Sequence, residues 1–319
     1  MCFVARIGAS AAPRGTGLGS LSDLVRRIHL FSKKNCGDLK LIDIGLNSLK
    51  VKPNIRIISP QIIKRFLPSN PIDIHKHKKG NVLVFAGLMS GASRLVALAS
   101  RKIGAGLSTI NIPEKYFRQY SGVEPGTIVD FKKNLQISKY SVFVIGPGLG
   151  LSFKKKNILK KLKNKIPAII DADAISIFEK KASMLIDILK ERKNSILTPH
   201  HGEFNKLFSF KAKNKILLSI KASQKTNSII IYKGNDTVIA CPNGNVWINN
   251  NAKNNLATAG TGDILAGIIA GLIAQKVDLE IASVLAVWIH GELSQNNNNV
   301  IAEDFINEIP KVLETIKNN

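Results

Sequence analysis

Hydrophobic and polar positions alternate in blocks along most of the chain from residue 81 onward. Short apolar runs with the length of strands buried on both faces occupy residues 81–87, 107–112, 141–146, 168–171, 195–199 and 228–234. Between the first two, residues 92–106 have helical spacing and close on Gly104. Strands that alternate with helices predict an α/β fold with a mostly parallel central sheet and helices on both faces.

Residues 237–250 depart from this pattern. Two apolar runs there are separated by a turn that contains Asn243 and Gly244, which predicts a β-hairpin with a two-residue turn. The apolar run that follows Asp263 is close to the length of a membrane span, but "KVDLE" interrupts it, and the run at 81–100 contains Arg94. We therefore assign both runs to the protein core and expect no membrane segment.

The composition changes at residue 33. The first 32 residues contain neither lysine nor asparagine and combine four arginines with glycine, alanine and serine, which resembles an organelle transit peptide. A disordered or unrelated start is the alternative, and it is the one we adopt. We therefore leave the first 32 residues out of the fold.

The net charge of +24 raises the possibility of a nucleic-acid partner. The lysines, however, are scattered singly and in short groups without interleaved aromatic residues, so we expect no nucleic-acid surface. Cys2, Cys36 and Cys241 lie far apart in the sequence, with no paired spacing. This pattern is typical of a protein of the reducing cytoplasm and predicts neither a disulfide framework nor a zinc site.

Small polar clusters follow nearly every predicted strand. They read "GLMSGAS", "GPGLG", "DADAI", "PHHGE" and "KGNDT" in chain order. Ligands of open α/β sheets bind outside the carboxyl ends of the strands. Five such clusters at the same end of the sheet therefore predict one shared cleft.

The stretch "NLATAGTGDILAGIIAGLIAQ" at 255–275 places Asp263 between a glycine-rich turn and an apolar helix. Gly260 and Gly262 leave main-chain amides unshielded at the helix N-terminus, where phosphate binds readily. Asp263 could serve only as an N-cap; we favour a base of ordinary pKa that accepts the proton of a hydroxyl attacking a phosphoryl group. Gly267 and Gly271 predict close packing of this helix against the sheet.

The other clusters are less specific. Lys233 could meet nucleotide phosphates or simply end a strand. Asp171 and Asp173 could approach magnesium or form a turn, and the glycine loop at 144–150 could be a ligand contact or a plain turn. His200 and His201 point in different directions, so one histidine contacting substrate is more plausible than a metal pair.

Taken in order, "VIGPGLG", "IIDADAI", "ILTPHHGEF", "IIYKGNDTVIACPNG" and "LATAGTGDILAGIIAGLIAQ" resemble the ADP-dependent NAD(P)H-hydrate dehydratase family, a branch of the ribokinase-like fold. The resemblance runs from about residue 67 to the C-terminus, which implies one ribokinase-like domain at 67–319 and an N-terminal segment at 1–35. Residues 36–46 resemble the final strand of the epimerase domain of bifunctional members, so 36–66 is expected to be a remnant of that domain and a linker. No epimerase activity is expected.

The resemblance implies a reaction. Family members phosphorylate the ring hydroxyl of hydrated NADH or NADPH (NADHX and NADPHX) from ADP and then lose phosphate, which restores the reduced cofactor and releases AMP. It also implies Mg²⁺ as a cofactor, a homotetramer and a cytoplasmic location.

The resemblance also assigns roles to residues. Asp263 is the expected catalytic base, and Glu203 would organise magnesium weakly, through phosphate or water. The residues expected to hold the AMP part are Lys233, Gly234, Asn235, Asp236, Thr237 and Gly262. Those expected to contact the hydrated cofactor are Ala92, Gly148, His200 and Asp263. Two departures are His201 in place of proline and Ala259 in place of glycine, and the second of these adds a methyl group beside the phosphate site.

Two other functions fit parts of the pattern. A ribokinase-like kinase would transfer phosphate from ATP to a small alcohol or vitamin precursor and release a stable phosphoester. A basic binding protein would use its charge on nucleic acid, with binding that depends on salt.

Overall fold

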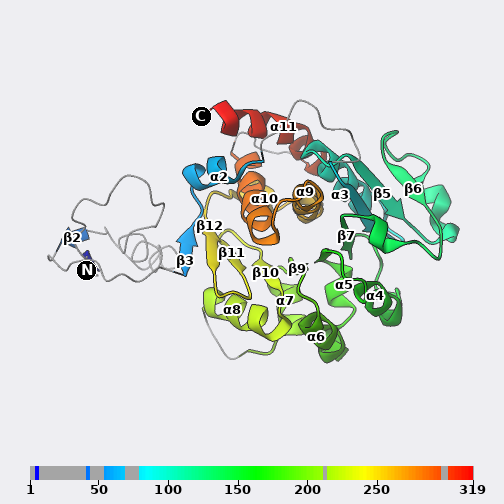
Figure 1. Ribbon diagram of the computed structural model, residues 1–319, viewed down its shortest axis with the longest axis horizontal. Coiled ribbons are helices and arrows are strands. Elements are labelled where there is room, and N and C mark those ends of the chain that lie inside the picture. The colour runs from blue at the N-terminus through cyan, green and yellow to red at the C-terminus, as the bar shows by residue number, and fades with distance from the viewer. Residues whose placement is uncertain are drawn as a thin grey trace.

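A ten-stranded sheet forms the centre of the protein (Figure 1). The computed structural model describes residues 4–6, 41–43, 54–68, 79–210, 214–295 and 301–318. The strands of the sheet are β3 (Ile55–Ile57), β4 (Asn81–Phe85), β5 (Leu107–Asn111), β6 (Ile128–Asp130), β7 (Val142–Ile145), β8 (Ala168–Ile170), β9 (Ser195–Leu197), β10 (Ile229–Tyr232), β11 (Thr237–Ala240) and β12 (Val246–Asn249). Their order is β3-β12-β11-β10-β9-β8-β7-β4-β5-β6, and only the β10–β11 and β11–β12 pairs are antiparallel.

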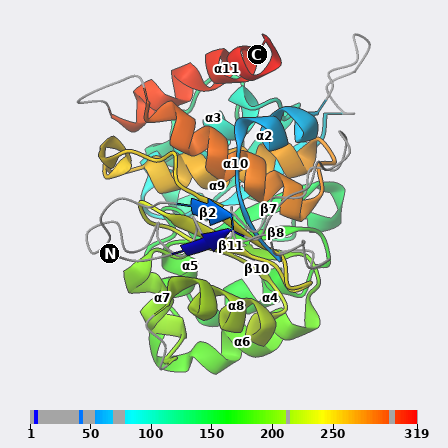
Figure 2. The ribbon, with the colours of Figure 1, turned by 90° about the vertical axis from the view of Figure 1, so that its left-hand side faces the viewer.

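Helices cover both faces of the sheet (Figure 2). One layer consists of α2 (Pro60–Phe66), α3 (Ser90–Lys102), α9 (Thr261–Ala274), α10 (Leu279–Leu293) and α11 (Ala302–Asn318). The other consists of α4 (Lys155–Leu162), α5 (Asp173–Ser176), α6 (Ala182–Glu191), α7 (His201–Leu207) and α8 (Lys215–Thr226). Short 3₁₀ helices lie at Glu114–Tyr120, Ile137–Lys139, Glu179–Lys181 and Asn254–Leu256. The predicted α/β fold class, with its mostly parallel sheet between two helical layers, is confirmed.

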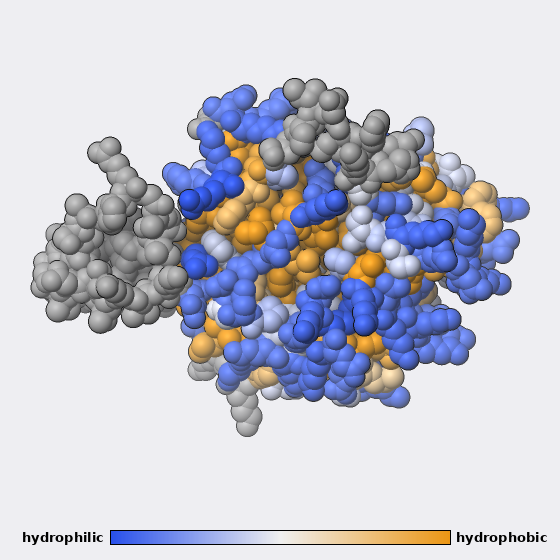
Figure 3. Space-filling model, viewed as in Figure 1, coloured by the Kyte–Doolittle hydropathy of each residue, from blue (hydrophilic) through white to orange (hydrophobic). Residues whose placement is uncertain are grey.

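Side chains of alternate strand residues pack into two separate hydrophobic cores, one on each face of the sheet. In β4, Val82 and Val84 join the core beneath α9 and α10, whereas Leu83 and Phe85 join the core beneath α4 and α6. This two-sided burial explains why the strands appear in the sequence as continuous apolar runs. Hydrophilic side chains cover most of the outer surface of the second layer, and apolar residues show in a band between the two layers (Figure 3).

The hairpin loop between β11 and β12 is longer than predicted. The Cys241 amide donates to the Asn245 carbonyl at 2.9 Å, and the Gly244 amide donates to the Cys241 carbonyl at 3.0 Å, so the loop holds three residues. Gly244 has a φ of +87°, whereas Asn243 is not among the residues with positive φ. A two-residue type I′ turn would need positive φ at both positions, so the chain adopts the three-residue form that ends on a left-handed glycine.

Gly267 and Gly271 serve a different contact from the predicted one. A Cβ atom at Gly267 would lie 2.5 Å from the Val96 carbonyl oxygen, and one at Gly271 would lie 2.5 Å from the Ser100 carbonyl oxygen. Both neighbours belong to α3, so the glycines allow close approach of α9 to α3 and not to the sheet. The buried helix α9 nevertheless occupies the predicted place in the core. Within the described ranges, none of the helices combines the length and apolar character needed to cross a bilayer.

Part of the segment predicted at 36–66 is integrated into the α/β fold. Strand β3 pairs in parallel with β12, and α2 packs against α10 and α11. We therefore propose that the domain begins near residue 54. Strands β1 (Val4–Arg6) and β2 (Leu41–Asp43) pair in parallel in a separate sheet. The rest of the predicted segments at 1–35 and 36–66 that precedes residue 54 lies outside the described residues.

Candidate active site

The first turn of α9 is held in place by a glycine that no larger residue could replace. Gly260 is the N-cap and has a φ of +90°, a left-handed conformation that disfavours other residues. A Cβ atom there would also lie 2.6 Å from Leu95 Cδ1 and 2.9 Å from Ala302 Cβ. The helix therefore begins in the gap between α3 and α11, with Asp263 as its third residue.

Asp263 is half-buried and has an unusual acidity. Burial, followed by the nearby carboxylate of Asp171, raises its pKa from the ordinary 3.8 to about 7. Lys233 opposes this rise, and Asp173 and Glu203 add to it more weakly. An ordinary pKa would be sufficient for the base inferred from the sequence. The raised pKa of Asp263 instead favours proton exchange near neutral pH.

Lys233 directly follows β10, and its side chain lies close to the start of α9. Its ammonium nitrogen lies 2.9 Å from Asp171 Oδ1 and 3.9 Å from Glu203 Oε2. It is also close to the start of α9, because a Cβ atom at Gly262 would lie 3.4 Å from it. Burial lowers the pKa of Lys233, but the surrounding carboxylates, Asp171 first, raise it by more, so the ammonium stays charged beside the helix amides.

Asp171 and Asp173, the two aspartates of the "DADAI" cluster, bind different partners. Asp171 is 1% exposed and holds Lys233. Asp173 begins α5, and its Oδ2 accepts a hydrogen bond from the Gly150 amide at 2.8 Å. Asp173 therefore shapes the glycine-rich loop, as in the turn-forming alternative, while Asp171 orients the cation. The pairing of Asp171 with Lys233 could not be predicted from the sequence.

Glu203 faces the same space from α7. It belongs to a capping box in which His200 Nδ1 accepts from the Gly202 amide at 3.0 Å, while Glu203 Oε2 accepts from the His200 amide at 2.9 Å. Burial raises the pKa of Glu203, and Lys233 opposes that rise. The His200 side chain remains 59% exposed, so its ring is open to a ligand at the edge of the carboxylate cluster.

His201 points elsewhere, as the sequence predicted for adjacent histidines. Its Nδ1 lies 2.7 Å from the Tyr232 hydroxyl, and its Nε2 lies 3.0 Å from Asn205 Nδ2. The imidazole also stacks on the Tyr232 ring. His201 is therefore held on the side of the sheet that carries α7 and α8.

Ala92 and Gly148 are brought together by two interlocked loops. The Met89 amide donates to the Gly148 carbonyl at 3.0 Å, and a Cβ atom at Gly148 would lie 2.1 Å from the Met89 carbonyl oxygen and 3.3 Å from Ala92 Cβ. Only glycine fits at 148, where φ is +66°. The two residues lie side by side at the start of α3, with Gly148 buried and Ala92 half-buried, although the sequence separates them widely.

The turn at 233–237 is stiffened by local bonds. Thr237 Oγ1 donates to the Gly234 carbonyl at 3.0 Å, and the Lys215 ammonium lies 3.3 Å from Asp236 Oδ1 and donates to the Asp236 carbonyl. The carboxylate of Asp236 is thereby engaged, and Asn235 is exposed. Main-chain groups of this turn and the exposed side chain of Asn235 are open to a ligand.

The sequence missed His290. This residue is half-buried in the apolar helix α10, and its Nε2 lies 2.8 Å from the Thr261 carbonyl oxygen. Burial lowers its pKa to about 4, so the ring is neutral at pH 7 and donates from Nε2. His290 thus holds the first turn of α9. The only available signal was a lone polar residue in an apolar run.

The site has an acidic character that bears on metal binding. Asp171, Glu203 and Asp263 face the single cation Lys233. Across the described ranges, however, no group of three or more histidine, cysteine, aspartate or glutamate side chains is arranged to hold a metal ion. A magnesium ion here would therefore need oxygen atoms from a bound phosphate, as Mg²⁺ commonly does.

The fold belongs to the ribokinase-like class, as comparison with solved structures shows. A ribokinase-like superfamily protein from Enterococcus faecalis V583 superposes with a TM-score of 0.72 and 26% identity, covering 86% of this chain and 100% of that one. The ADP/ATP-dependent NAD(P)H-hydrate dehydratase of Bacillus subtilis, co-crystallised with ATP and Mg²⁺, gives 0.71 and 27%, covering 82% and 99%.

Sequence comparison narrows the class to one family. The model of the NAD(P)H-hydrate dehydratase family matches residues 82–314, so the chain belongs to that family. The bifunctional NAD(P)H-hydrate repair enzyme Nnr of Coxiella burnetii is 32% identical over 80% of this chain. The match covers 54% of that enzyme, so the chain spans about half the length of this curated relative. The family membership suggested by the motifs is confirmed, whereas the roles of individual site residues stay predictions.

Proposed function

We propose that the protein dehydrates the (6S) hydrate of NADH and NADPH at the expense of ADP, giving AMP, phosphate and the restored reduced cofactor. The observation that carries the proposal is the proximity of Asp263 and Lys233 at the main-chain amides that begin α9. A carboxylate with a pKa of about 7 suits proton transfer, and the amides with the lysine suit a phosphoryl group. Membership of the dehydratase family supports the same reaction.

The residues suggest an order of events. Asp263 takes the proton from the ring hydroxyl as the hydroxyl oxygen attacks the β-phosphorus of ADP, and the bond from that phosphorus to the AMP oxygen breaks. The amides of Gly262 and Asp263, with Lys233, stabilise the charge on the transferred group. The new phosphoester then leaves the ring carbon as phosphate with the bonding electrons. Loss of a proton from the adjacent ring carbon restores the double bond.

We assign the nucleotide and the hydrate to opposite sides of Asp263. The turn from Lys233 to Thr237, including Gly234, Asn235 and Asp236, together with Gly262, would hold the AMP part. The region beside Ala92 and Gly148, with the exposed ring of His200, would receive the hydrated nicotinamide. Magnesium would neutralise charge on the phosphates, with Glu203 holding it through water or through the phosphate itself.

Identifying the products tests the proposal. Purified protein with the (6S) hydrate, ADP and magnesium should regenerate the absorbance of reduced nicotinamide and form AMP and phosphate in equal amounts. The alternative, a ribokinase-like kinase of a small alcohol or vitamin precursor, would transfer from ATP and accumulate a stable phosphoester. That alternative is not favoured by the family match. Absence of regenerated cofactor with either ADP or ATP would refute the dehydratase function.

We also propose a cytoplasmic homotetramer, in line with the family resemblance. Support comes from the apolar side chains exposed around edge strand β6, namely Phe117, Ile128 and Phe131, which are 51%, 47% and 47% exposed. Light scattering coupled to size-exclusion chromatography measures the mass directly. A monomer at micromolar concentration would contradict this part of the proposal.

A further inference from the structure

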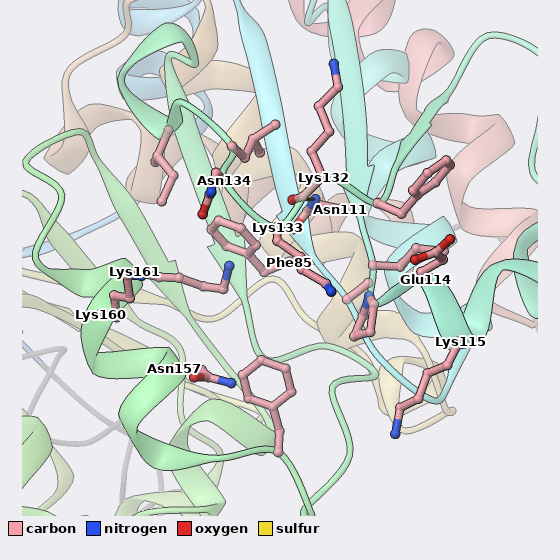
Figure 4. Close-up of a pocket in the computed structure, with 17 residues that line it drawn as sticks. Phe85, Asn111, Glu114, Lys115, Lys132, Lys133, Asn134, Asn157, Lys160 and Lys161 are labelled. Carbon is pink, nitrogen blue, oxygen red and sulfur yellow. Dashed lines mark hydrogen bonds between the residues drawn. The ribbon is translucent and has the colours of Figure 1, made fainter.

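A cavity lies away from the carboxylate cluster (Figure 4). It occupies about 750 Å³ between the carboxyl ends of β4 and β5, the segment 131–137 and helix α4. This volume is typical of small-molecule sites. The carboxyl ends of parallel strands are also where α/β sheets bind ligands.

The cavity is strongly basic. Its lining includes one carboxylate, Glu114, and the lysines Lys115, Lys132, Lys133, Lys160 and Lys161. Among the described residues, none of these five lysines takes part in an ion pair, although other lysines of the chain do. Like charges gathered without counter-ions repel each other, so an anion bound among them would be stabilised.

Lys161 is the most constrained of these cations. It is half-buried, and its ammonium nitrogen lies 3.5 Å from the centre of the Phe85 ring. Burial, and then the neighbouring Lys160, lowers the pKa of Lys161 to about 8. In Figure 4, Lys133 and Lys161 extend toward the interior of the cavity, whereas Lys115 and Lys132 extend outward at its rim. An anion in the interior would therefore contact Lys133 and Lys161 first.

The wall opposite α4 is held by hydrogen bonds between side chains and the backbone. Asn111 Nδ2 donates to the carbonyls of Asp130 and Lys132, each at 3.2 Å. The Lys132 amide in turn donates to Asp130 Oδ1 at 2.8 Å. These bonds tie the segment that begins at residue 131 to the end of β5. Ligand binding therefore does not carry the entropic cost of ordering the start of this segment.

The cavity is separate from the candidate active site but adjoins its loops. Neither Lys233 nor Asp263 lines it. Ala86, which lines the cavity, directly precedes the loop that locks against Gly148. Phe153, on another wall, donates its amide to the Gly150 carbonyl at 3.0 Å. A ligand in the cavity thus contacts residues at the base of both interlocked loops.

We propose that this lysine-lined cavity binds the phosphate groups of a nucleotide, with Lys133 and Lys161 as the principal contacts. The apolar side chains of Phe131, Leu135 and Phe153 supply walls for the attached ring. Two sources share this chemistry: the adenosine-phosphate half of the hydrated dinucleotide, or a separate nucleotide. The first source rests on the proposed dehydratase function and the second does not.

Competitive lysine labelling tests the site in the wild-type protein. A limiting amount of an acetylating reagent is added with pyrophosphate, ADP or NADPH, and acetylation of each lysine is followed by peptide mass spectrometry. At a ligand concentration ten times the dissociation constant, Lys133 and Lys161 should react about tenfold more slowly. Lys139 and Lys156, exposed lysines outside the cavity, are the controls and should react at an unchanged rate.

Three results of the labelling would overturn the proposal. One is an unchanged rate at Lys133 and Lys161 with all three ligands. Another is equal slowing at the two control lysines, which would indicate general screening of charge. The third comes from a parallel reaction with RNA: protection by RNA but by none of the small phosphates would indicate a nucleic-acid surface.

Steady-state kinetics identify the source. If the hydrate's own phosphates occupy the cavity, the double variant Lys133→Met/Lys161→Met should raise the KM for the hydrate about tenfold, with kcat and the KM for ADP unchanged. The matched variant Lys139→Met/Lys156→Met should behave as wild type. If a separate nucleotide occupies it, the KM for the hydrate should stay constant while ADP protects the cavity lysines. Inactivity of the wild type would refute the dehydratase function alone, because the labelling does not depend on turnover.

Discussion

Asp263→Asn is expected to abolish turnover and, at the same time, to stabilise the folded protein above pH 7. The carboxylate is held beside Asp171 in a partly buried position, which suits proton transfer but disfavours its charged form. Asparagine has nearly the same shape and carries no charge. The substitution therefore removes both the base and the destabilising charge.

The magnitude follows from the pKa. In the folded protein it is about 7, against an ordinary value of 3.8, a difference of about three units. Because each unit corresponds to about 1.4 kcal/mol, the charged carboxylate lowers the free energy of unfolding by up to about 4 kcal/mol above pH 7. Asp263 is partly exposed and interacts with Lys233, so we expect a gain of about 2–4 kcal/mol in the variant.

The sign of the pH dependence is also fixed. Between pH 4 and pH 7 the folded state binds more protons at Asp263 than the unfolded state does, so this residue makes stability fall as the pH rises through that window. Above about pH 7 its unfavourable contribution is constant. The difference between variant and wild type should therefore be largest at pH 8 and less than half as large at pH 5.

Thermal unfolding of the ligand-free proteins at pH 5 and pH 8 measures this difference. For a chain of this size we expect about 2 °C for each kcal/mol, hence a melting temperature at pH 8 that is about 4–8 °C higher in the variant. Turnover of the hydrate with ADP should fall by about 100-fold or more, the usual effect of losing a general base. Titration calorimetry should show that ADP still binds.

Asp187→Asn is the control, because Asp187 is 68% exposed and pairs only with Lys190 on its own helix. Its melting temperature should match wild type at both pH values. A variant Asp263→Asn that melts at or below the wild-type temperature at pH 8 would refute the assigned burial of charge. A variant that retains wild-type turnover would refute the role of Asp263 as the base, whatever its stability.

Three further substitutions test other parts of the structure. Lys233→Met leaves the carboxylate of Asp171 buried without its partner, so we expect a loss of about 2–4 kcal/mol in unfolding free energy by denaturant titration and weaker ADP binding by calorimetry. Glu280→Ala removes the carboxylate that accepts hydrogen bonds from three side chains of the β11–β12 hairpin. The unfolding free energy should fall by about 2–3 kcal/mol, and the KM for ADP should stay unchanged. Gly267→Ala sets a methyl group against the Val96 carbonyl, so α3 and α9 must separate. We expect the unfolding free energy to fall by about 1–3 kcal/mol, despite the better helix propensity of alanine. An unchanged melting temperature would contradict the close contact.

Most of the sheet could be predicted from the sequence because burial on both faces makes each strand a continuous apolar run. Strands β4, β5, β7, β8, β9 and β10 all fall within predicted runs. Edge strands β3 and β6 were not predicted, because each has three residues and is paired on one side only. A short edge strand is recognised by its neighbour in space, and the sequence does not show that neighbour.

The parts of the candidate site had unequal signals. Asp263 and the surrounding glycines were visible, because an acid between a glycine turn and an apolar helix is rare in a core element. The ion pair of Lys233 with Asp171, which are 62 residues apart, and the bond from His290 to Thr261 were not visible. Each of these contacts depends on the order of strands and helices in space. Residue type showed where chemistry could occur, and the packing decided which groups act on each other.

Asp171 shows why the acidity of Asp263 had to be found in the structure. Its carboxylate raises the pKa of Asp263 and also holds the ammonium of Lys233, which lowers it. Asp171, a buried side chain at the end of β8, thus has two opposite effects on the pKa of Asp263. Burial of Asp263 is the largest cause, and the net result is a raised pKa. Phosphate binding at the helix amides would bring further negative charge to Asp263 and raise its pKa again, while an added cation would lower it. The proton affinity of the base is therefore set jointly by β8, β10 and the ligand, which no single motif encodes.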